Sequence, residues 1–313
     1  MYRQFFLTFQ NKFGINVEVV AGGGGADIGP RVSAERQAGQ YLYDVVVHGA
    51  AVGFETLKPL GALDPLRSAL ILPEVLDNSK WRDGFDAGWA DSGKSLVYSF
   101  ASQVDWNVRL NRAVVPESQL SRFDQLWDPR WKGKIVWFDP RVPGTGAGKA
   151  GIVLYYKGED KLRTIFRDQQ LVLSQDNRQI AESILRGQQP IGVGVDVRGL
   201  ADLQTGGADV SSIQPLADNE DPAARQLTSS TGAIGLVNRA LHPNAAKALI
   251  NWILSQDGQT AYTKTGYNSR RLDAPAVDAE RLPESGKQYV DLNTETGRPT
   301  FLRAVEIAKA ELK

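Results

Sequence analysis

The stretch WDPRWKGKIVWFDPRVPGTGAG, residues Trp127–Gly148, decides the fold class of this chain. Its apolar run Ile135–Phe138 is typical of a strand, and the small apolar residues of Ala147–Tyr156 are typical of a helix. The Pro-Gly-Thr-Gly turn between them, residues 143–146, is glycine-rich. A strand, a glycine-rich turn and a helix start together offer free backbone N–H groups to an anion. The stretch therefore predicts an α/β protein that holds a ligand.

The same alternation of strands and helices continues outside this stretch, which favours a largely parallel sheet. Further strands are predicted at 15–20, 43–47, 171–173, 191–197 and 232–237. Further helices are predicted at 2–13, around 31–36, at 159–168, 177–187 and 243–258. Residues 95–110 read as extended chain that crosses between two lobes. Trp106 and Asn107 lie on this crossing segment, where they can face a ligand.

Composition excludes several classes of function. The 313 residues suffice for two lobes, and Lys+Arg equals Asp+Glu at 36 each, so the broad positive field of a nucleic-acid-binding protein is absent. Without any Cys, the chain has no disulfide, thiolate nucleophile or cysteine metal site. Only His48 and His242 are histidines, which excludes a His-rich metal cluster. No apolar run approaches the length of about 20 residues that spans a bilayer.

Four segments, in this order and spacing, resemble the periplasmic substrate-binding proteins of bacterial ABC importers, in the branch that includes ferric-iron-binding proteins. They are YDVVVHGAAVGFETLKPLGALDPL, LWDPRWKGKIVWFDPRVPGTGAG, DNRQIAESILRGQQPIGVGVD and TGAIGLVNRALHPNAAKALINWILSQDGQTAYTKTGY. The resemblance covers about residues 5–270 and implies the type II two-lobed α/β fold. Lobe one would comprise 1–105 and 232–313, and lobe two 106–231. Crossing strands would join the lobes, and the ligand cleft between them would close like a hinge.

The resemblance also implies a binding role rather than catalysis, with ligand contacts at the ends of strands and the starts of helices. In the second lobe, Gly144 and Thr145 lie at one predicted helix start and Asn177 at the cap of another. Each position also has a plain structural explanation, such as a tight turn, an N-cap, a surface ion pair or a buried histidine. The expected ligand-binding residues are His48, Gly49, Ala50, Arg141, Gly144, Thr145, Gly146, Asn177, Asp196 and Arg198.

The cargo is expected to differ from bare iron. Ferric-iron-binding relatives place a tyrosine pair where this chain reads Val195–Arg198, and they commonly place a carboxylate near His48–Ala50. A hard ferric ion prefers phenolate and carboxylate oxygens, and Arg198 would repel it. We therefore expect a small anionic solute of the carboxylate or phosphonate type, without a metal or cofactor. Two alternatives stay open: ferric ion held with an anion such as citrate or carbonate, and an enzyme on the same scaffold, although no GxSxG elbow is present.

The resemblance also implies the expected partners and location. Relatives normally begin with an export signal and a strand before the first helix, whereas this sequence starts directly at the predicted helix 2–13. We expect that the signal was removed and that the protein is periplasmic. It would act as a monomer and deliver its ligand to an ABC permease in the inner membrane, with no role for nucleic acid.

Overall fold

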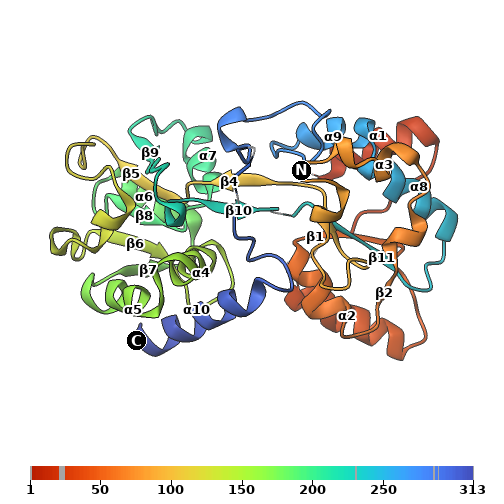
Figure 1. Cartoon of the computed structure of the whole chain (residues 1–313), viewed down its shortest axis with the longest axis horizontal. Helices are drawn as coiled ribbons and strands as arrows, with labels where there is room; N and C mark the ends of the chain where they lie inside the picture. Colours follow the sequence, from red (N-terminus) through yellow and green to blue (C-terminus); the bar gives the residue numbers. More distant parts are fainter. Residues whose placement is uncertain (1, 21–24, 230, 285, 288, 313) are drawn as a thin grey trace. The chain divides into compact units, whose positions relative to one another are not determined.

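A computed structural model describes residues 2–20, 25–229, 231–284, 286–287 and 289–312. The chain folds into two compact units, which are described separately (Figure 1). Unit 1 comprises Met1–Gln103, Thr228–Lys287 and Asn293–Thr296, and unit 2 comprises Val104–Leu227, Gln288–Leu292 and Gly297–Lys313. Strands β4 (Gln103–Asp105) and β10 (Gln226–Thr228) pair with each other where the chain passes between the units, which confirms the predicted crossing strands.

Unit 1 is built around strand β11, whose five residues are all buried. β11 pairs antiparallel with β1, β2 and β3, so that Val46 lies opposite Gly235 and Tyr98 opposite Ile234. The strands of unit 1 are β1 (Val45–His48), β2 (Leu63–Asp64), β3 (Tyr98–Ser99) and β11 (Ala233–Val237). Its helices are α1 (Tyr2–Phe13), α2 (Gly25–Gln37), α3 (Pro73–Leu76), α8 (Pro243–Leu254) and α9 (Gln256–Thr263).

Helix α1 confirms the first predicted helix. Phe5, Phe6 and Phe9 share its buried face, and the rings of Phe5 and Trp252 of α8 lie 5.0 Å apart between centroids. Gly14 ends the helix with a φ of +68°, a conformation that side chains rarely adopt. The helical spacing of Phe5, Phe6 and Phe9 therefore reflects how α1 packs on the core of unit 1.

Unit 2 contains a sheet with the strand order β7-β6-β8-β5-β9, in which β7, β6 and β8 are parallel. Its strands are β5 (Val108–Asn111), β6 (Ile135–Phe138), β7 (Val172–Ser174), β8 (Ile191–Val193) and β9 (Ile213–Pro215). Its helices are α4 (Thr145–Lys157), α5 (Glu159–Asp168), α6 (Asn177–Leu185), α7 (Val197–Thr205) and α10 (Arg298–Glu311). Short 3₁₀ or π turns of the chain lie at Val52–Leu57, Leu66–Ala69, Asn78–Lys80, Phe85–Gly88, Phe123–Trp127, Pro129–Trp131, Pro222–Ala224 and Ala279–Arg281.

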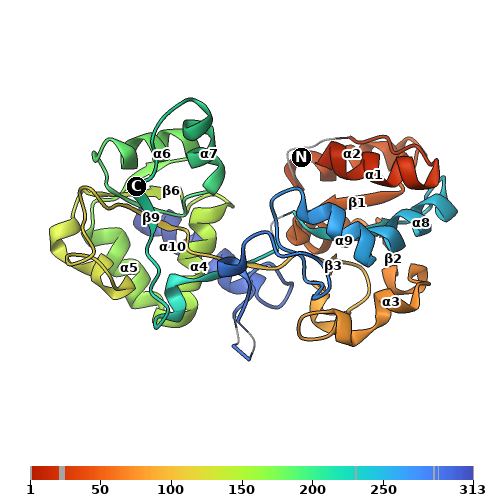
Figure 2. The same cartoon turned by 90° about the horizontal axis from the view of Figure 1, so that it is seen from above.

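Helices cover both faces of the unit 2 sheet. Helices α6 and α7 lie on one side of it and α4, α5 and α10 on the other (Figure 2). Strand β6 contributes to both cores, because Ile135 and Trp137 pack with the α4 and α5 side chains whereas Val136 packs with Ile180 and Ile184 of α6. This doubly covered sheet confirms the predicted α/β arrangement. The predicted largely parallel sheet is confirmed only for β7, β6 and β8, because β5 is antiparallel to β8 and β9, and in unit 1 β1, β2 and β3 are antiparallel to β11.

Several predicted elements require correction. The helix predicted over 243–258 is two helices, because α8 ends at Leu254 and Ser255 then caps α9. Residues 15–20 form no strand, and the predicted strand 191–197 ends at Val193, after which Gly194 has a φ of +73° and Val197 begins α7. The C-terminal part of the proposed lobe one, 232–313, also divides differently, because α10 belongs to unit 2. Phe301 and Ala308 of α10 are buried there in the same core as the residues of α4. The predicted loop 21–24 lies outside the described residues.

Candidate functional site

The carboxyl edge of the unit 2 sheet brings three helix starts together. Strands β6, β7 and β8 are parallel and lead into α4, α6 and α7, so their ends meet at one edge. The Thr145 hydroxyl at the start of α4 donates a hydrogen bond of 2.5 Å to the Gly194 carbonyl after β8. Gly199 of α7 packs so closely on α6 that a Cβ there would lie 2.4 Å from the Asn177 carbonyl oxygen. The predicted residues of lobe two therefore do converge.

The glycines of the β6–α4 turn have a packing role. A Cβ on Gly146 would lie 1.7 Å from the Phe138 carbonyl oxygen, which no real side chain permits. The indole of Trp137 donates a hydrogen bond of 3.1 Å to the Gly146 carbonyl. Gly144 has an extended backbone and lies against the ring of Phe138. Close packing of α4 on the end of β6 thus explains these glycines, and it leaves the helix start without side-chain bulk.

The cap of α6 is not the residue that the sequence suggested. Asp176 is the N-cap, and its carboxylate accepts hydrogen bonds from the backbone N–H groups of Arg178 and Gln179. Asn177 is instead the first helical residue. Its side-chain oxygen is buried and accepts no hydrogen bond from the part of the chain that the structure describes. Asn177 therefore keeps an amide available at the strand edge, although the capping is done by its neighbour.

Arg141 is engaged within the protein. Its guanidinium forms a two-point ion pair with Asp139, with Nε–Oδ1 and Nη2–Oδ2 distances of 2.9 and 3.0 Å. The hydrogen bond from Arg141 lowers the pKa of the buried Asp139 carboxyl, and Gln175 donates to the same carboxylate. Arg141 was expected to bind the ligand, but its guanidinium stabilises the β6–α4 loop through Asp139.

Asp196 and Arg198 lie at the third helix start. Asp196 immediately precedes α7, and its carbonyl accepts a hydrogen bond of 3.2 Å from the Gly199 N–H. Arg198 is the second residue of α7, and its side chain lies outside the described part of the structure. Both residues are at the sheet edge as predicted, but on a loop and a helix rather than on a strand.

Two side-chain amides adjoin this edge, one between β4 and β5 and one on β10. Asn107 was expected from its position, and its Nδ2 donates a hydrogen bond of 2.8 Å to Oε1 of Gln226. Its main-chain carbonyl accepts from the N–H of Val195, one residue before Asp196. Gln226 was missed, because nothing in its sequence surroundings indicates that β10 pairs with β4 and carries this side chain to α4.

A buried lysine lies one helical turn beyond Thr145. Lys149 is fully buried, lies over the Phe123 ring, and donates hydrogen bonds of 3.0 Å to the carbonyls of Ala223 and Ala224. Burial lowers the pKa of Lys149 to about 7. A lysine so deeply enclosed by carbonyls belongs to the fold of unit 2 and does not contact the anion-binding edge directly.

The remaining predicted residues, His48–Ala50, belong to unit 1. His48 ends β1 and is buried, and its Nδ1 lies 2.6 Å from the Gly49 carbonyl oxygen. Burial lowers the pKa of the His48 imidazole to about 4, so the ring is neutral at pH 7. Its Nε2 has no hydrogen-bond partner among the described residues. Ala50 is likewise buried, at the start of the helical turn that contains Val52–Leu57.

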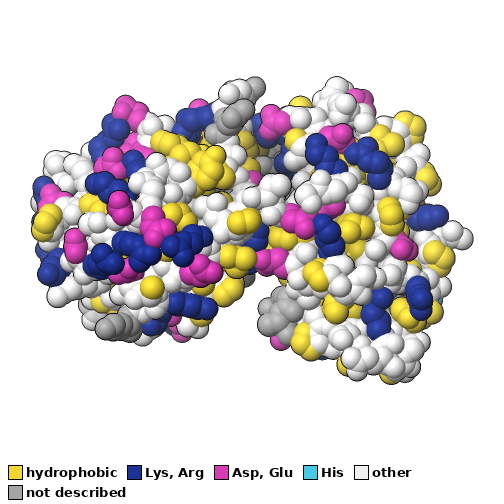
Figure 3. Space-filling model, turned by 60° about the horizontal axis from the view of Figure 1, so that its bottom comes forward, with side chains coloured by type: hydrophobic (Ala, Val, Ile, Leu, Met, Phe, Trp, Pro, Cys, Tyr) yellow, Lys and Arg dark blue, Asp and Glu magenta, His cyan; other side chains and the backbone are white. Residues whose placement is uncertain are grey.

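Surface charge, the placement of metal-ligating side chains and the length of the helices each bear on what the protein can bind. On the face shown in Figure 3, acidic side chains are interspersed among basic ones. Within the described ranges, no group of three or more His, Cys, Asp or Glu side chains is placed to hold a metal ion. The described helices include none that is long and apolar enough to cross a membrane.

Comparison with known proteins decides the family. The family model of bacterial extracellular solute-binding proteins matches residues 4–290. The chain belongs to this family. The solute-binding protein is thus a component of ABC import systems and has the two-lobed fold of periplasmic binding proteins. No protein of curated function matches it in sequence.

Solved structures share the fold at low sequence identity. The iron-bound protein HitA from Pseudomonas aeruginosa is 16% identical, with a TM-score of 0.68 over 98% of this chain and 94% of that one. The ferric binding protein from Campylobacter jejuni is 17% identical, with a TM-score of 0.71 over 98% and 94%. AfuA from Actinobacillus pleuropneumoniae, with bound fructose-6-phosphate, is 18% identical, with a TM-score of 0.64 over 99% and 94%. At these identities the likeness concerns the fold of the solute-binding protein, not its cargo.

Proposed function

We propose that the solute-binding protein captures a small anionic solute, of the carboxylate or phosphonate type, at the carboxyl edge of the unit 2 sheet. The convergence of the starts of α4, α6 and α7 carries this proposal. Each start presents the positive end of a helix dipole, which favours an anion, and the start of α4 has no side-chain cap on its N–H groups, whereas Asp176 already caps α6. The buried amide oxygen of Asn107, which has no partner among the described residues, is a second and independent polar feature beside this edge.

The proposed contacts divide by type. Backbone N–H groups around Gly144–Gly146 would bind the anionic group, and the Asn177 amide and Arg198 at the other two helix starts would complete its surroundings. Arg141 supports the loop through Asp139 instead of touching the solute. The solute would then pass from the periplasm to the membrane permease of the importer.

Thermal melting with a panel of small carboxylates, phosphonates and phosphates tests this function. Members that bind should raise the melting temperature, and above Kd the stabilisation should grow with the logarithm of the ligand concentration. Native mass spectrometry of the protein purified without ligand exchange then identifies the endogenous cargo by mass. A neutral cargo in that spectrum, together with no response to any anion, would overturn the proposal.

A ferric complex is the second candidate, because two of the structural neighbours contain iron, one of them together with citrate. Ferric chloride with and without citrate is therefore included in the melting panel. A rise in melting temperature only when both are present, with a visible absorption band, would favour the ferric complex. A response to citrate alone supports the anion site.

A further inference from the structure

Asn107 holds a buried hydrogen-bonding atom that no described residue of the protein bonds. Its side chain is 6% exposed, and Nδ2 donates to Gln226 Oε1, but Oδ1 has no partner among the described residues. Asn111, on the same stretch of chain, shows the usual arrangement. Its Nδ2 donates to the carbonyls of Ile184 and Leu185, and its Oδ1 accepts from Ala113 N–H at 3.1 Å. The Asn107 amide therefore differs from a purely structural buried asparagine.

The Asn107–Gln226 amide pair spans two parts of the proposed anion site. A Cβ on Gly148, in the first turns of α4, would lie 2.6 Å from Gln226 Nε2, so a larger residue at position 148 would displace the glutamine. At the other end, the Asn107 carbonyl accepts a hydrogen bond of 3.0 Å from Val195 N–H, next to Asp196. The pair is thus fixed between the helix start that would bind the anion and the loop that leads into α7.

We infer that the Asn107–Gln226 pair makes this site select solutes that carry a hydroxyl or amino group beside their anionic group. The inference rests on the proposed function and adds a second recognition element to it. A carboxylate or phosphonate accepts hydrogen bonds only, so it suits the N–H groups of the helix starts and not Asn107 Oδ1. An O–H or N–H on the same solute would satisfy that buried oxygen. A solute without a donor would leave the oxygen dehydrated and unpaired, which weakens binding.

Matched pairs of anions test the inference by calorimetry. The pairs are 2-hydroxyethylphosphonate against ethylphosphonate, and glycerate against propionate. The wild-type protein should bind the hydroxylated member about tenfold or more tightly, as expected for one buried hydrogen bond. Asn107→Leu should reduce this ratio of affinities to near one. Gln226→Met, at a partly exposed position that orients the Asn107 amide, should reduce the ratio as well.

Asn111→Leu is the matched control, since it removes a buried asparagine whose bonds are all internal. It should lower the melting temperature while the preference for hydroxylated anions stays. If both members of each pair bind the wild type equally, the inference fails and the anion site stands. If the Gln226→Met protein, which keeps Asn107, and the Asn107→Leu protein both retain the full preference, the inference also fails. If no member of either pair binds, the proposed anion site fails, and the inference fails with it.

Discussion

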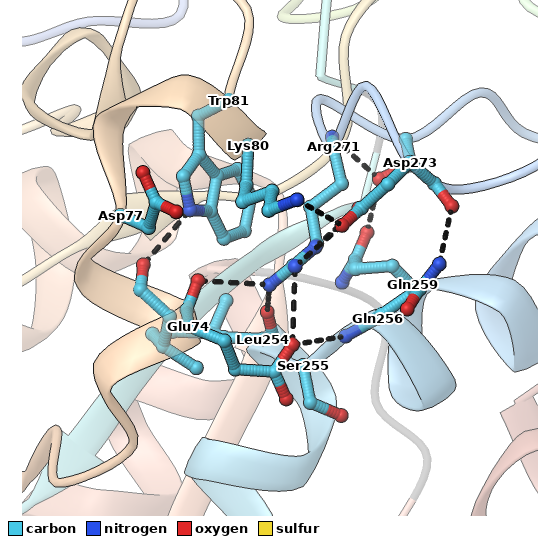
Figure 4. Close-up of polar contacts among 12 residues, drawn as sticks. Glu74, Asp77, Lys80, Trp81, Leu254, Ser255, Gln256, Gln259, Arg271 and Asp273 are labelled. Atoms are coloured by element: carbon cyan, nitrogen blue, oxygen red, sulfur yellow. Dashed lines mark hydrogen bonds and ion pairs between the residues drawn. The ribbon is translucent and has the colours of Figure 1, made fainter.

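The guanidinium of Arg271 lies over the ring of Trp81, 5.3 Å from its centroid, and neither side chain has access to solvent. In the same place Arg271 pairs with the carboxylates of Glu74 and Asp273 and donates a hydrogen bond of 3.0 Å to the Leu254 carbonyl (Figure 4). This one side chain joins three segments of unit 1, namely residues 74–81, the end of α8 at Leu254, and the loop 271–273 that contains Arg271 itself. Removing either the buried cation or its partners leaves an uncompensated buried charge, which strongly lowers the stability of the fold.

Arg271→Met should therefore destabilise unit 1 by about 3–5 kcal/mol, because the carbonyls and the two carboxylates lose their donor. Urea unfolding at pH 7 measures the loss. Arg303→Met is the control, since Arg303 is a half-exposed member of a surface ion-pair group with Glu159, and its removal should cost much less. Equal losses in the two variants would show that the Arg271 cluster contributes no more than a surface ion pair.

The lowered pKa of Lys149 is expected to make the stability of unit 2 depend on pH. Burial lowers its pKa to about 7 in the folded protein, whereas an unfolded lysine titrates near its ordinary value of 10.5. Between these two values the unfolded state binds one proton more than the folded state, so stability rises with pH. Over that interval the free energy of unfolding should increase by about 3–5 kcal/mol in the wild type. Below pH 7 both states are protonated, and the contribution is constant.

Lys149→Met should remove this rise, and urea unfolding at pH 7, 8, 9 and 10 measures it. Lys309→Met, at an exposed position of α10, makes the same change of charge and should leave the slope unaltered. If the Lys149→Met and wild-type proteins show parallel pH dependence, Lys149 does not titrate in this range.

The sequence predicted most elements of unit 2 because their signals are local. Helix α5 has the predicted bounds of 159–168, since its apolar face and its end at a charged turn lie within ten residues. The strand signal of 191–197 was misleading, because β8 ends at Val193 before Gly194, which has positive φ, and Val197, the last residue of the run, begins α7. The alternation at 15–20 predicted a strand, but residues 15–20 pair with no neighbouring strand.

The candidate site was predictable in its position but not in its partners. Strand ends and helix starts have local sequence signals. Those signals placed Thr145 and Asp196 at one edge of the sheet, where the structure has them. The bond of Arg141 to Asp139 joins two residues of a short loop, and its geometry depends on backbone angles that composition does not specify. The pairing of Asn107 with Gln226 joins residues 119 positions apart, so only the folded β4–β10 pair reveals it.

The contact between Glu295 and Lys58 in unit 1 is expected to weaken in acid. Lys58 Nζ donates to both of its carboxylate oxygens at 2.7 Å, and Ser92 donates through its N–H and its hydroxyl. The Lys58 hydrogen bond, with Ser92, lowers the pKa of Glu295 to about 2. Because the folded pKa is lower than the ordinary value of 4.5, this contact stabilises the protein above about pH 4.5. The stabilisation is lost as the pH falls towards 2.

Glu295→Gln should lower the free energy of unfolding at pH 7 by about 1–2 kcal/mol, since both partners are about one-third exposed and partly screened by solvent. The difference from the wild type should disappear near pH 2, which urea unfolding at pH 7, 5, 4 and 3 can follow. Glu284→Gln, on an exposed glutamate paired with Lys287, serves as the control. A difference that persists unchanged at pH 3 would assign the effect to something other than the Glu295 charge.

Arg198 offers the sharpest test of the anion site, because it is the second residue of α7, one of the three helix starts of the proposed site. Arg198→Ala should weaken anion binding by about tenfold or more, as for a charged hydrogen bond. Arg186→Ala, at the C-terminal end of α6, is the matched control and should not change binding. An anion-induced melting shift that is the same in the Arg198→Ala and wild-type proteins would remove Arg198 from the site, whereas a lowered melting temperature without ligand would indicate a structural role.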